Sequence, residues 1–92
     1  MKHYEREYRG ARLRVEINDK METYLYINGI QRDSDSPTST GYCSLVSTIQ
    51  TDYEWHELIR AEVNISGSEV VIKLSANNKT LGKEFFRIDT KS

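Results

Sequence analysis

A chain of 92 residues is long enough for one small domain and too short for a second hydrophobic core. Hydrophobic residues make up 37% of it and the formal net charge is −1, which excludes a highly charged disordered chain and a globally basic nucleic-acid binder. Its apolar runs fall far short of the ~18–20 residues of a membrane-spanning helix, so we expect no membrane partner.

The opening residues contain no apolar stretch of the kind found in a secretory signal. The chain has one cysteine, Cys43, which has no second cysteine with which to form an internal disulfide. A single cysteine fits a reducing compartment. We therefore expect a cytoplasmic protein.

Apolar and polar residues alternate with a period of two along most of the chain, which predicts half-buried β-strands. The predicted strands, in chain order, cover 11–18, 21–27, 30–33, 42–50, 58–66, 69–75 and 80–89, and 3–9 is a candidate eighth strand with Gly10 as a bulge or kink. Turn-forming residues separate these segments. The predicted fold is all-β: a small antiparallel sandwich or flattened barrel of seven or eight short strands in largely meander order.

The first clear hairpin lies around Asn18, Asp19 and Lys20. A two-residue turn would place apolar residues opposite charged ones, whereas a three-residue loop keeps the apolar residues on one face. We therefore predict a loop over 18–20 in which Asn or Asp takes the left-handed conformation. The outer-face pairs of this register are Arg14 with Tyr24 and Arg12 with Tyr26.

Residues 33–41 contain the only proline and no apolar side chain, which is typical of a flexible loop. Composition does not change enough across this segment to mark a domain boundary. We predict a single all-β domain over 1–92, whose N-terminal half and C-terminal half are joined by loop 33–41.

Residues 51–57 do not follow the strand pattern. Thr51 and Glu54 have the spacing of a helix capping box, and a short helix over 52–58 is one alternative. The uninterrupted alternation from Ile59 onward favours an ordered loop or one short helical turn near 52–57 that leads into the next strand. We expect Trp55 to close one end of the core, with an exposed anchor on this loop as the alternative.

Gly67 and Ser68 predict a two-residue turn between the two most regular strands. This turn places every inward residue opposite another apolar residue. It also places residues of opposite charge opposite each other on the outer face, which favours the same register. The predicted pairs are Ile65 with Val70, Val63 with Ile72, Ala61 with Leu74 and, on the outer face, Glu62 with Lys73.

The alternate, mostly apolar residues of each predicted strand are expected to point inward and form the core. Its side chains are aliphatic or aromatic with one alanine, and they come from both halves of the chain. The expected core residues are Leu13, Val15, Ile17, Leu25, Ile27, Leu45, Ile49, Ile59, Ala61, Val63, Ile65, Val70, Ile72, Leu74, Phe86 and Ile88.

Cys43, His56 and Asp52 are the residue types of a thiol nucleophile, its base and an orienting group. No local signature accompanies them, and Cys43 lies in the inward phase of its strand, where a cysteine behaves as a small hydrophobe. We therefore expect no catalytic residue and a protein that is not an enzyme.

Metal and cofactor chemistry lack a recognisable ligand pattern. His3 and His56 are the only imidazoles, and their spacing is not that of zinc ligands. The five glycines are scattered singly and form no phosphate-binding loop. We expect no metal and no cofactor.

The most informative polar surface is the outer face of the first predicted hairpin. If Leu25 faces the core, Tyr24 and Tyr26 project outward beside Arg12 and Arg14, a combination enriched at protein interfaces. The neighbouring residues that we expect to extend this surface are Tyr4, Arg6, Tyr8 and Arg9. Stacking between arginine and tyrosine within a solvated sheet is the alternative, purely structural interpretation.

These features predict a small non-enzymatic interaction module that binds a protein partner through Arg12, Arg14, Tyr24 and Tyr26. Sheet faces with aromatic and basic residues also bind single-stranded nucleic acid, which is the alternative function for the same face. The absence of net positive charge ranks that alternative second, and an enzyme of unknown chemistry ranks third. The sequence does not indicate an oligomeric state.

Overall fold

The structure is a computed structural model that describes residues 2–36, 41–52 and 55–87, with the side chains of residues 51, 52 and 55 left undescribed. The described residues form eight β-strands and no helix. The chain is thus all-β, as predicted. Among the described residues, no helix has the length and apolar character needed to cross a membrane.

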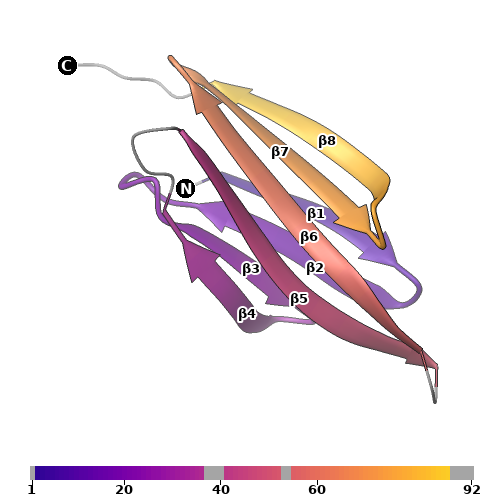
Figure 1. Ribbon diagram of the computed structural model, residues 1–92. Coiled ribbons are helices and arrows are strands. Elements are labelled where there is room, and N and C mark those ends of the chain that lie inside the picture. Colours follow the sequence, from indigo (N-terminus) through magenta and orange to yellow (C-terminus); the bar gives the residue numbers. More distant parts are fainter. Residues whose placement is uncertain (1, 37–40, 53–54, 88–92) are drawn as a thin grey trace.

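The strands divide into two antiparallel sheets, each a four-stranded meander, and the sheets lie over each other as two layers (Figure 1). The first sheet contains β1 (Lys2–Tyr8), β2 (Ala11–Ile17), β3 (Thr23–Ile27) and β4 (Ile30–Asp35). The second sheet contains β5 (Tyr42–Asp52), β6 (Trp55–Ser66), β7 (Glu69–Ala76) and β8 (Lys79–Arg87). This is the sandwich-like alternative of the predicted fold.

The core lies between the two layers, because alternate residues of each strand point inward. Ile65 and Phe86 of the expected core are only partly buried, and Ile88 lies outside the described residues, as does the side chain of Trp55. The structure adds Ala11, Cys43 and Ala76 to the expected set. The buried apolar residues are Ala11, Leu13, Val15, Ile17, Leu25, Ile27, Cys43, Leu45, Ile49, Ile59, Ala61, Val63, Val70, Ile72, Leu74 and Ala76.

The register between β6 and β7 is the predicted one. The residue pairs confirmed here are Ile65 with Val70, Val63 with Ile72, Ala61 with Leu74 and Glu62 with Lys73. On the outer face, Lys73 Nζ lies 3.7 Å from Glu62 Oε2. A two-residue turn fixes a register from local sequence alone, which explains this success.

The first hairpin has a different register from the predicted one. Its loop closes where the Asn18 N–H donates a hydrogen bond to the Glu22 carbonyl, and the left-handed residue is Met21 (φ 65°) rather than an Asn or Asp. Asn18 instead stays beside the strand, and its Oδ1 accepts hydrogen bonds from the N–H groups of Lys20 and Glu22, both at 2.9 Å. The loop is therefore moved one residue along the chain.

This movement shifts the pairing of β2 and β3 by two residues and leaves the faces unchanged, because side chains alternate with a period of two. Arg14 lies opposite Tyr26 and Glu16 lies opposite Tyr24, which corrects the predicted pairs Arg14 with Tyr24 and Arg12 with Tyr26. Arg12 instead lies beside Asn28, whose Oδ1 accepts a hydrogen bond from the Arg12 N–H at 2.9 Å.

Three further local predictions are wrong. Gly10 is not a bulge: Arg9 (φ 49°) and Gly10 (φ 81°) form a tight two-residue turn between Tyr8 and Ala11. The predicted loop 33–41 is shorter at its start, because β4 continues to Asp35, while residues 37–40 lie outside the described part.

The third error is the helical turn or loop predicted near 52–57. β5 continues to Asp52 and β6 begins at Trp55, and these two residues are cross-strand partners; residues 53 and 54 lie outside the described part. β5 and β6 are the longest strands, with 11 and 12 residues, and their hairpin extends beyond the first sheet at the lower right of Figure 1. Pairing along this hairpin prevails over the capping-box pattern.

Side chains of the first sheet cover edge groups of the second sheet on both sides of the sandwich. Where β4 lies beside β5, Arg32 Nη2 donates to the Thr48 carbonyl at 3.2 Å and the Val46 N–H donates to Asp33 Oδ2 at 2.9 Å. Where β1 lies beside β8, Arg6 Nη2 donates to the Leu81 carbonyl at 2.9 Å. These contacts satisfy backbone groups that an edge strand otherwise exposes to other chains.

Candidate functional site

The outer face of the first sheet carries the four residues predicted as a binding site. Leu25 is fully buried, so its neighbours Tyr24 and Tyr26 point outward, and both are half-buried. Arg14 is also half-buried, whereas Arg12 is exposed. We call this surface, defined by Arg12, Arg14, Tyr24 and Tyr26, the Tyr/Arg face. Its four residues lie on the same side of the sheet, as the predicted odd-length loop requires.

The two tyrosine rings lie next to each other along β3. Their ring centroids are 6.4 Å apart and the ring planes are inclined by 41°. This distance is within the range in which aromatic pairs attract each other. The two rings therefore lie next to each other on the outer side of the sheet.

Arg14 is held by two carboxylates, one on the neighbouring strand and one on its own strand. Arg14 Nη1 lies 3.3 Å from Glu5 Oε2 on β1, and Arg14 Nε donates a hydrogen bond to Glu16 Oε2 on β2. These contacts fix the guanidinium against the sheet and neutralise its charge. Within the described residues no carboxylate lies at ion-pair distance from Arg12, so Arg12 carries the free cation of the Tyr/Arg face.

A shallow, open depression of about 310 Å³ lies on this face. Arg12, Arg14 and Tyr26 contribute to its lining, so three of the four predicted residues share one concave surface. Glu5, Glu16 and Gly29 complete the lining. The depression is lined by two guanidinium groups, two carboxylates and one aromatic ring, which is the composition of a surface that recognises polar and aromatic groups together.

The expected extension of this face by β1 is wrong. In the observed register Tyr4 pairs with Val15, Arg6 with Leu13 and Tyr8 with Ala11, and these β2 residues are all buried on the inner side. Tyr4, Arg6 and Tyr8 therefore point toward the second sheet. Arg9 lies in the turn after β1.

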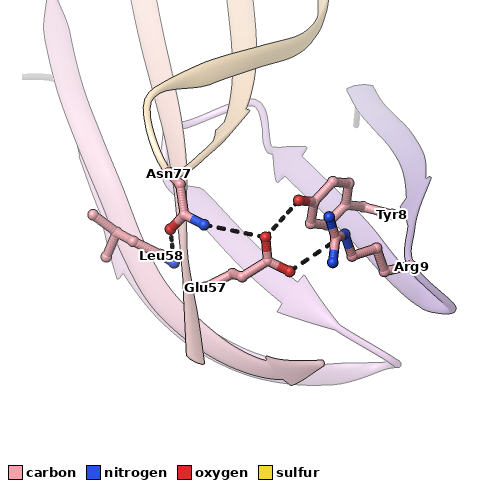
Figure 2. A network of polar contacts seen from close by, with 5 residues as sticks. All are labelled: Tyr8, Arg9, Glu57, Leu58 and Asn77. Atoms are coloured by element: carbon pink, nitrogen blue, oxygen red, sulfur yellow. Dashed lines mark hydrogen bonds and ion pairs between the residues drawn. The ribbon is translucent and has the colours of Figure 1, made fainter. Parts of the chain in front are cut away.

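Tyr8 and Arg9 belong to a second polar cluster, centred on Glu57 of β6 (Figure 2). Glu57 is only 7% exposed, on the inner phase of its strand. The Tyr8 hydroxyl donates to Glu57 Oε1 at 2.6 Å, Asn77 Nδ2 donates to the same oxygen at 3.1 Å, and Arg9 Nε lies 3.6 Å from Glu57 Oε2. The carboxylate thus connects the β1–β2 turn of the first sheet to two elements of the second.

Asn77 is itself fixed by the main chain of β6. Its N–H donates to the Leu58 carbonyl at 2.8 Å. Its Oδ1 accepts from the Leu58 N–H at 2.9 Å, as Figure 2 shows. Asn77 and Asn78 both have positive φ and form the two-residue turn between β7 and β8. The Glu57 cluster therefore consists of groups whose positions are set by turns at one end of the sandwich.

The hydrogen bond to the Glu57 carboxylate, with burial as a second cause, raises the pKa of Tyr8 above its ordinary value of 10.0. The carboxylate stabilises the protonated phenol because it accepts its hydrogen, and the Arg9 charge opposes this effect. A phenol held protonated in this way acts as a hydrogen-bond donor and not as a base at neutral pH. The cluster is thus best explained as a polar connection between the sheets.

Sequence reasoning missed Glu57 because it assigned residues 51–57 to a loop. One signal was available: Glu57 is in phase with Ile59, Ala61 and Val63, the inward residues of the same strand. A carboxylate in the inward phase indicates a buried, satisfied charge.

The structure does not bring Cys43, Asp52 and His56 together. Cys43 is 4% exposed on the inner side of β5, whereas His56 is exposed and pairs with Gln50, seven residues from Cys43 along the strand. Seven residues of strand correspond to about 24 Å. Burial raises the pKa of the Cys43 thiol above its ordinary 9.0, while the Thr23 hydroxyl partly opposes this shift. A buried protonated thiol is a poor nucleophile.

Within the described residues, no group of three or more His, Cys, Asp or Glu side chains has the arrangement of a metal site. His3 and His56 lie on different sheets. Comparison with protein-family models, with curated proteins and with solved structures finds no match to this chain.

Proposed function

We propose that this protein is a small non-enzymatic interaction module that binds a protein partner through the Tyr/Arg face. The observation that carries the proposal is the depression lined by Arg12, Arg14 and Tyr26, beside the second outward-pointing, half-buried tyrosine, Tyr24. Tyrosine and arginine are enriched among the few residues that contribute most of the binding energy at protein interfaces. The single cysteine, Cys43, is compatible with a cytoplasmic setting for such a module.

The fixed geometry of the face supports binding. Arg14 is already held by Glu5 and Glu16, and the main chain of Arg12 is held by Asn28. Side chains that are ordered before association lose less conformational entropy when a partner arrives. The rigid part of the face therefore contributes to affinity without a large ordering cost.

The free cation defines the chemistry of the partner. Arg12 has no carboxylate at ion-pair distance among the described residues, and it lines two neighbouring depressions. A partner that presents a carboxylate to Arg12, with an apolar or aromatic side chain against Tyr26, would complete both contacts.

Single-stranded nucleic acid remains the alternative ligand for this face, but the charges favour it less. Glu5, Glu7 and Glu16 point outward with Arg12 and Arg14, so the described carboxylates of this face outnumber its guanidinium groups. Phosphates would meet this excess of negative charge. A protein partner can present both signs of charge, and it therefore fits better.

The proposal is tested by capture from a lysate of the native cell, followed by direct titration of the captured protein in purified form. Replacing Arg12 and Tyr26 together by alanine should weaken the purified complex by at least about 2 kcal/mol, the effect expected at an interface centre. Arg12→Ala alone should leave the melting temperature nearly unchanged, because the Arg12 side chain is exposed.

Arg87→Ala is the matched control, since it removes an exposed arginine from the other sheet. It should leave the complex intact. Equal affinity of the wild type and of the double variant for every captured protein would overturn the proposal. Loss of affinity in proportion to loss of stability would instead support the structural interpretation of the Tyr/Arg face.

A further inference from the structure

The outer face of the second sheet carries an exposed basic and aromatic stripe on β8. Lys83, Phe85 and Arg87 alternate along the strand and are all exposed, and the Phe85 side chain is among the most exposed large apolar groups, at 65%. We call these three residues the Lys/Phe/Arg stripe. A large apolar ring kept in water between two cations costs solvation free energy, and a ligand that covers it recovers that cost.

The cations of this stripe have no ion-pair partner among the described residues. Arg87 is the cross-strand neighbour of Glu69, yet no ion pair joins them. Lys83 lies directly opposite Lys73, a pair of like charges. The nearby carboxylate of Glu62 pairs with Lys73 at 3.7 Å. Opposed like charges destabilise a sheet, and an anion between them removes the repulsion.

The whole outer face of the second sheet has an excess of positive charge, although the chain has a net charge of −1. Its described basic side chains outnumber the acidic ones, whereas the Tyr/Arg face has the opposite balance. The charged residues that point outward here are Arg60, Lys73, Lys83, Arg87, Glu62 and Glu69.

The row of residues that contains Phe85 ends in a second exposed aromatic ring. From β8 to β5 this row is Phe85, Val71, Asn64 and Tyr42. Tyr42 is 41% exposed, and its hydroxyl donates to Glu62 Oε1 at 3.0 Å. With neighbouring strands ~4.8 Å apart, the two aromatic residues are about 14 Å apart across the sheet.

From this arrangement we propose that the outer face of the second sheet binds single-stranded nucleic acid. One base stacks on Phe85, and Lys83 and Arg87 contact the backbone phosphates on either side of it. Residues two apart on a strand are separated by about 7 Å, so the cations flank the ring closely. Aromatic platforms bordered by cations bind single strands with little sequence preference, because every base has a flat face that can stack.

A separate surface carries this binding, so it is independent of the proposed protein interaction. An acidic protein segment would also meet the cations, but it has no flat base for the exposed ring. The contribution of Phe85 therefore distinguishes the two kinds of ligand. Nucleic acid requires both the ring and the cations, whereas an acidic peptide requires mainly the cations.

The test uses fluorescence anisotropy of a labelled oligothymidylate of about 12 nucleotides, titrated with the full chain at about 50 mM and about 200 mM salt. Phe85→Ala should weaken binding by about 5- to 150-fold. Lys83→Ala and Arg87→Ala should each reduce the slope of log affinity against log salt by about 0.7, the value for one phosphate contact with a single strand.

Lys79→Ala is the matched control. Lys79 is an exposed lysine on the same strand, but it pairs with Ala76, outside the stripe. Lys79→Ala should retain most of the affinity, and adding Phe85→Ala to it should weaken binding as much as Phe85→Ala does in the wild type. Because Phe85, Lys83 and Arg87 are exposed, each variant should keep its melting temperature within a few degrees.

Absence of binding by the wild type at the lower salt concentration would overturn the proposal. So would equal affinity of the wild type and Phe85→Ala. A polyglutamate peptide that binds as tightly as the oligonucleotide, with no loss in Phe85→Ala, would assign the face to an acidic protein and overturn it as well. Weaker binding of that peptide, together with the loss in Phe85→Ala, supports nucleic acid.

Discussion

The hydroxyl of Tyr8 donates a hydrogen bond of 2.6 Å to the carboxylate of Glu57, a residue 49 positions later in the chain and in the other sheet (Figure 2). This bond joins the first hairpin turn to β6 across one end of the sandwich. Asn77 reaches the same oxygen from the β7–β8 turn. One buried carboxylate therefore fixes three parts of the chain that local sequence leaves independent.

Replacing Glu57 by alanine should destabilise the fold by about 3 kcal/mol, because it leaves the phenol and the amide without their charged acceptor. Glu57→Gln keeps a carbonyl for the Tyr8 hydroxyl and should be less harmful. Urea unfolding measures both values. Glu7→Ala, which removes an exposed glutamate from β1, is the control and should change stability by less than about 0.5 kcal/mol. A cost for Glu57→Ala as small as that of this control would contradict the structural role.

Alkaline pH should weaken the fold partly through Tyr8. Its pKa is higher in the folded chain than the ordinary 10.0, so the folded state holds this proton more tightly. The stabilisation is fully present below about pH 10 and is lost as the pH rises through the folded-state pKa. The difference in unfolding free energy between the wild type and Tyr8→Phe should therefore shrink above pH 10. A difference that stays constant or grows with pH would show that the phenol proton does not contribute.

The first hairpin should depend on the side chain of Asn18. Its Oδ1 accepts two backbone hydrogen bonds, and Asn18→Ala leaves both donors without that partner. We expect a loss of about 1–2 kcal/mol by chemical denaturation. Asn18→Asp keeps the acceptor but loses the Nδ2 donor to Glu22. Its unfolding free energy should therefore lie between those of the wild type and Asn18→Ala. An alanine variant as stable as the wild type would indicate that the register has another determinant.

Gly41 should be the least replaceable of the described glycines. It has a φ of 73°, and a Cβ there would overlap the carbonyl oxygen of Ile65, whose N–H donates to the Gly41 carbonyl at 2.6 Å. Gly29 has a similar φ of 81° but open space around the Cβ position. Gly29→Ala therefore measures only the cost of placing an alanine at a positive φ. Thermal unfolding should place Gly41→Ala at least about 2 kcal/mol below Gly29→Ala. Equal costs would mean that the backbone near Ile65 moves aside freely.

The Tyr/Arg face shows which structural features the sequence pattern could predict and which it could not. The odd number of residues in the first loop placed Tyr24 and Tyr26 on the outer side, because successive side chains of a strand point to opposite faces and an odd or even loop length therefore decides the face. The same reasoning paired Arg14 with the wrong tyrosine, since the loop closes at Asn18 and Glu22. The faces were therefore predictable, and the neighbours across the hairpin were not.

Period-two alternation, together with the turn at Gly67 and Ser68, determined by itself the all-β class, most of the buried core residues and the register of β6 with β7. These properties follow from backbone geometry within a few residues. Only the tertiary structure decided that Glu57 is buried and that its carboxylate meets Tyr8 of the other sheet. The contacts of Arg14 with Glu5 and of Lys83 with Lys73 lie within hairpins whose registers were not predicted. The Glu57 contact depends on which strands of the two sheets become neighbours, and such pairings between distant segments are set by the packing of the whole sandwich.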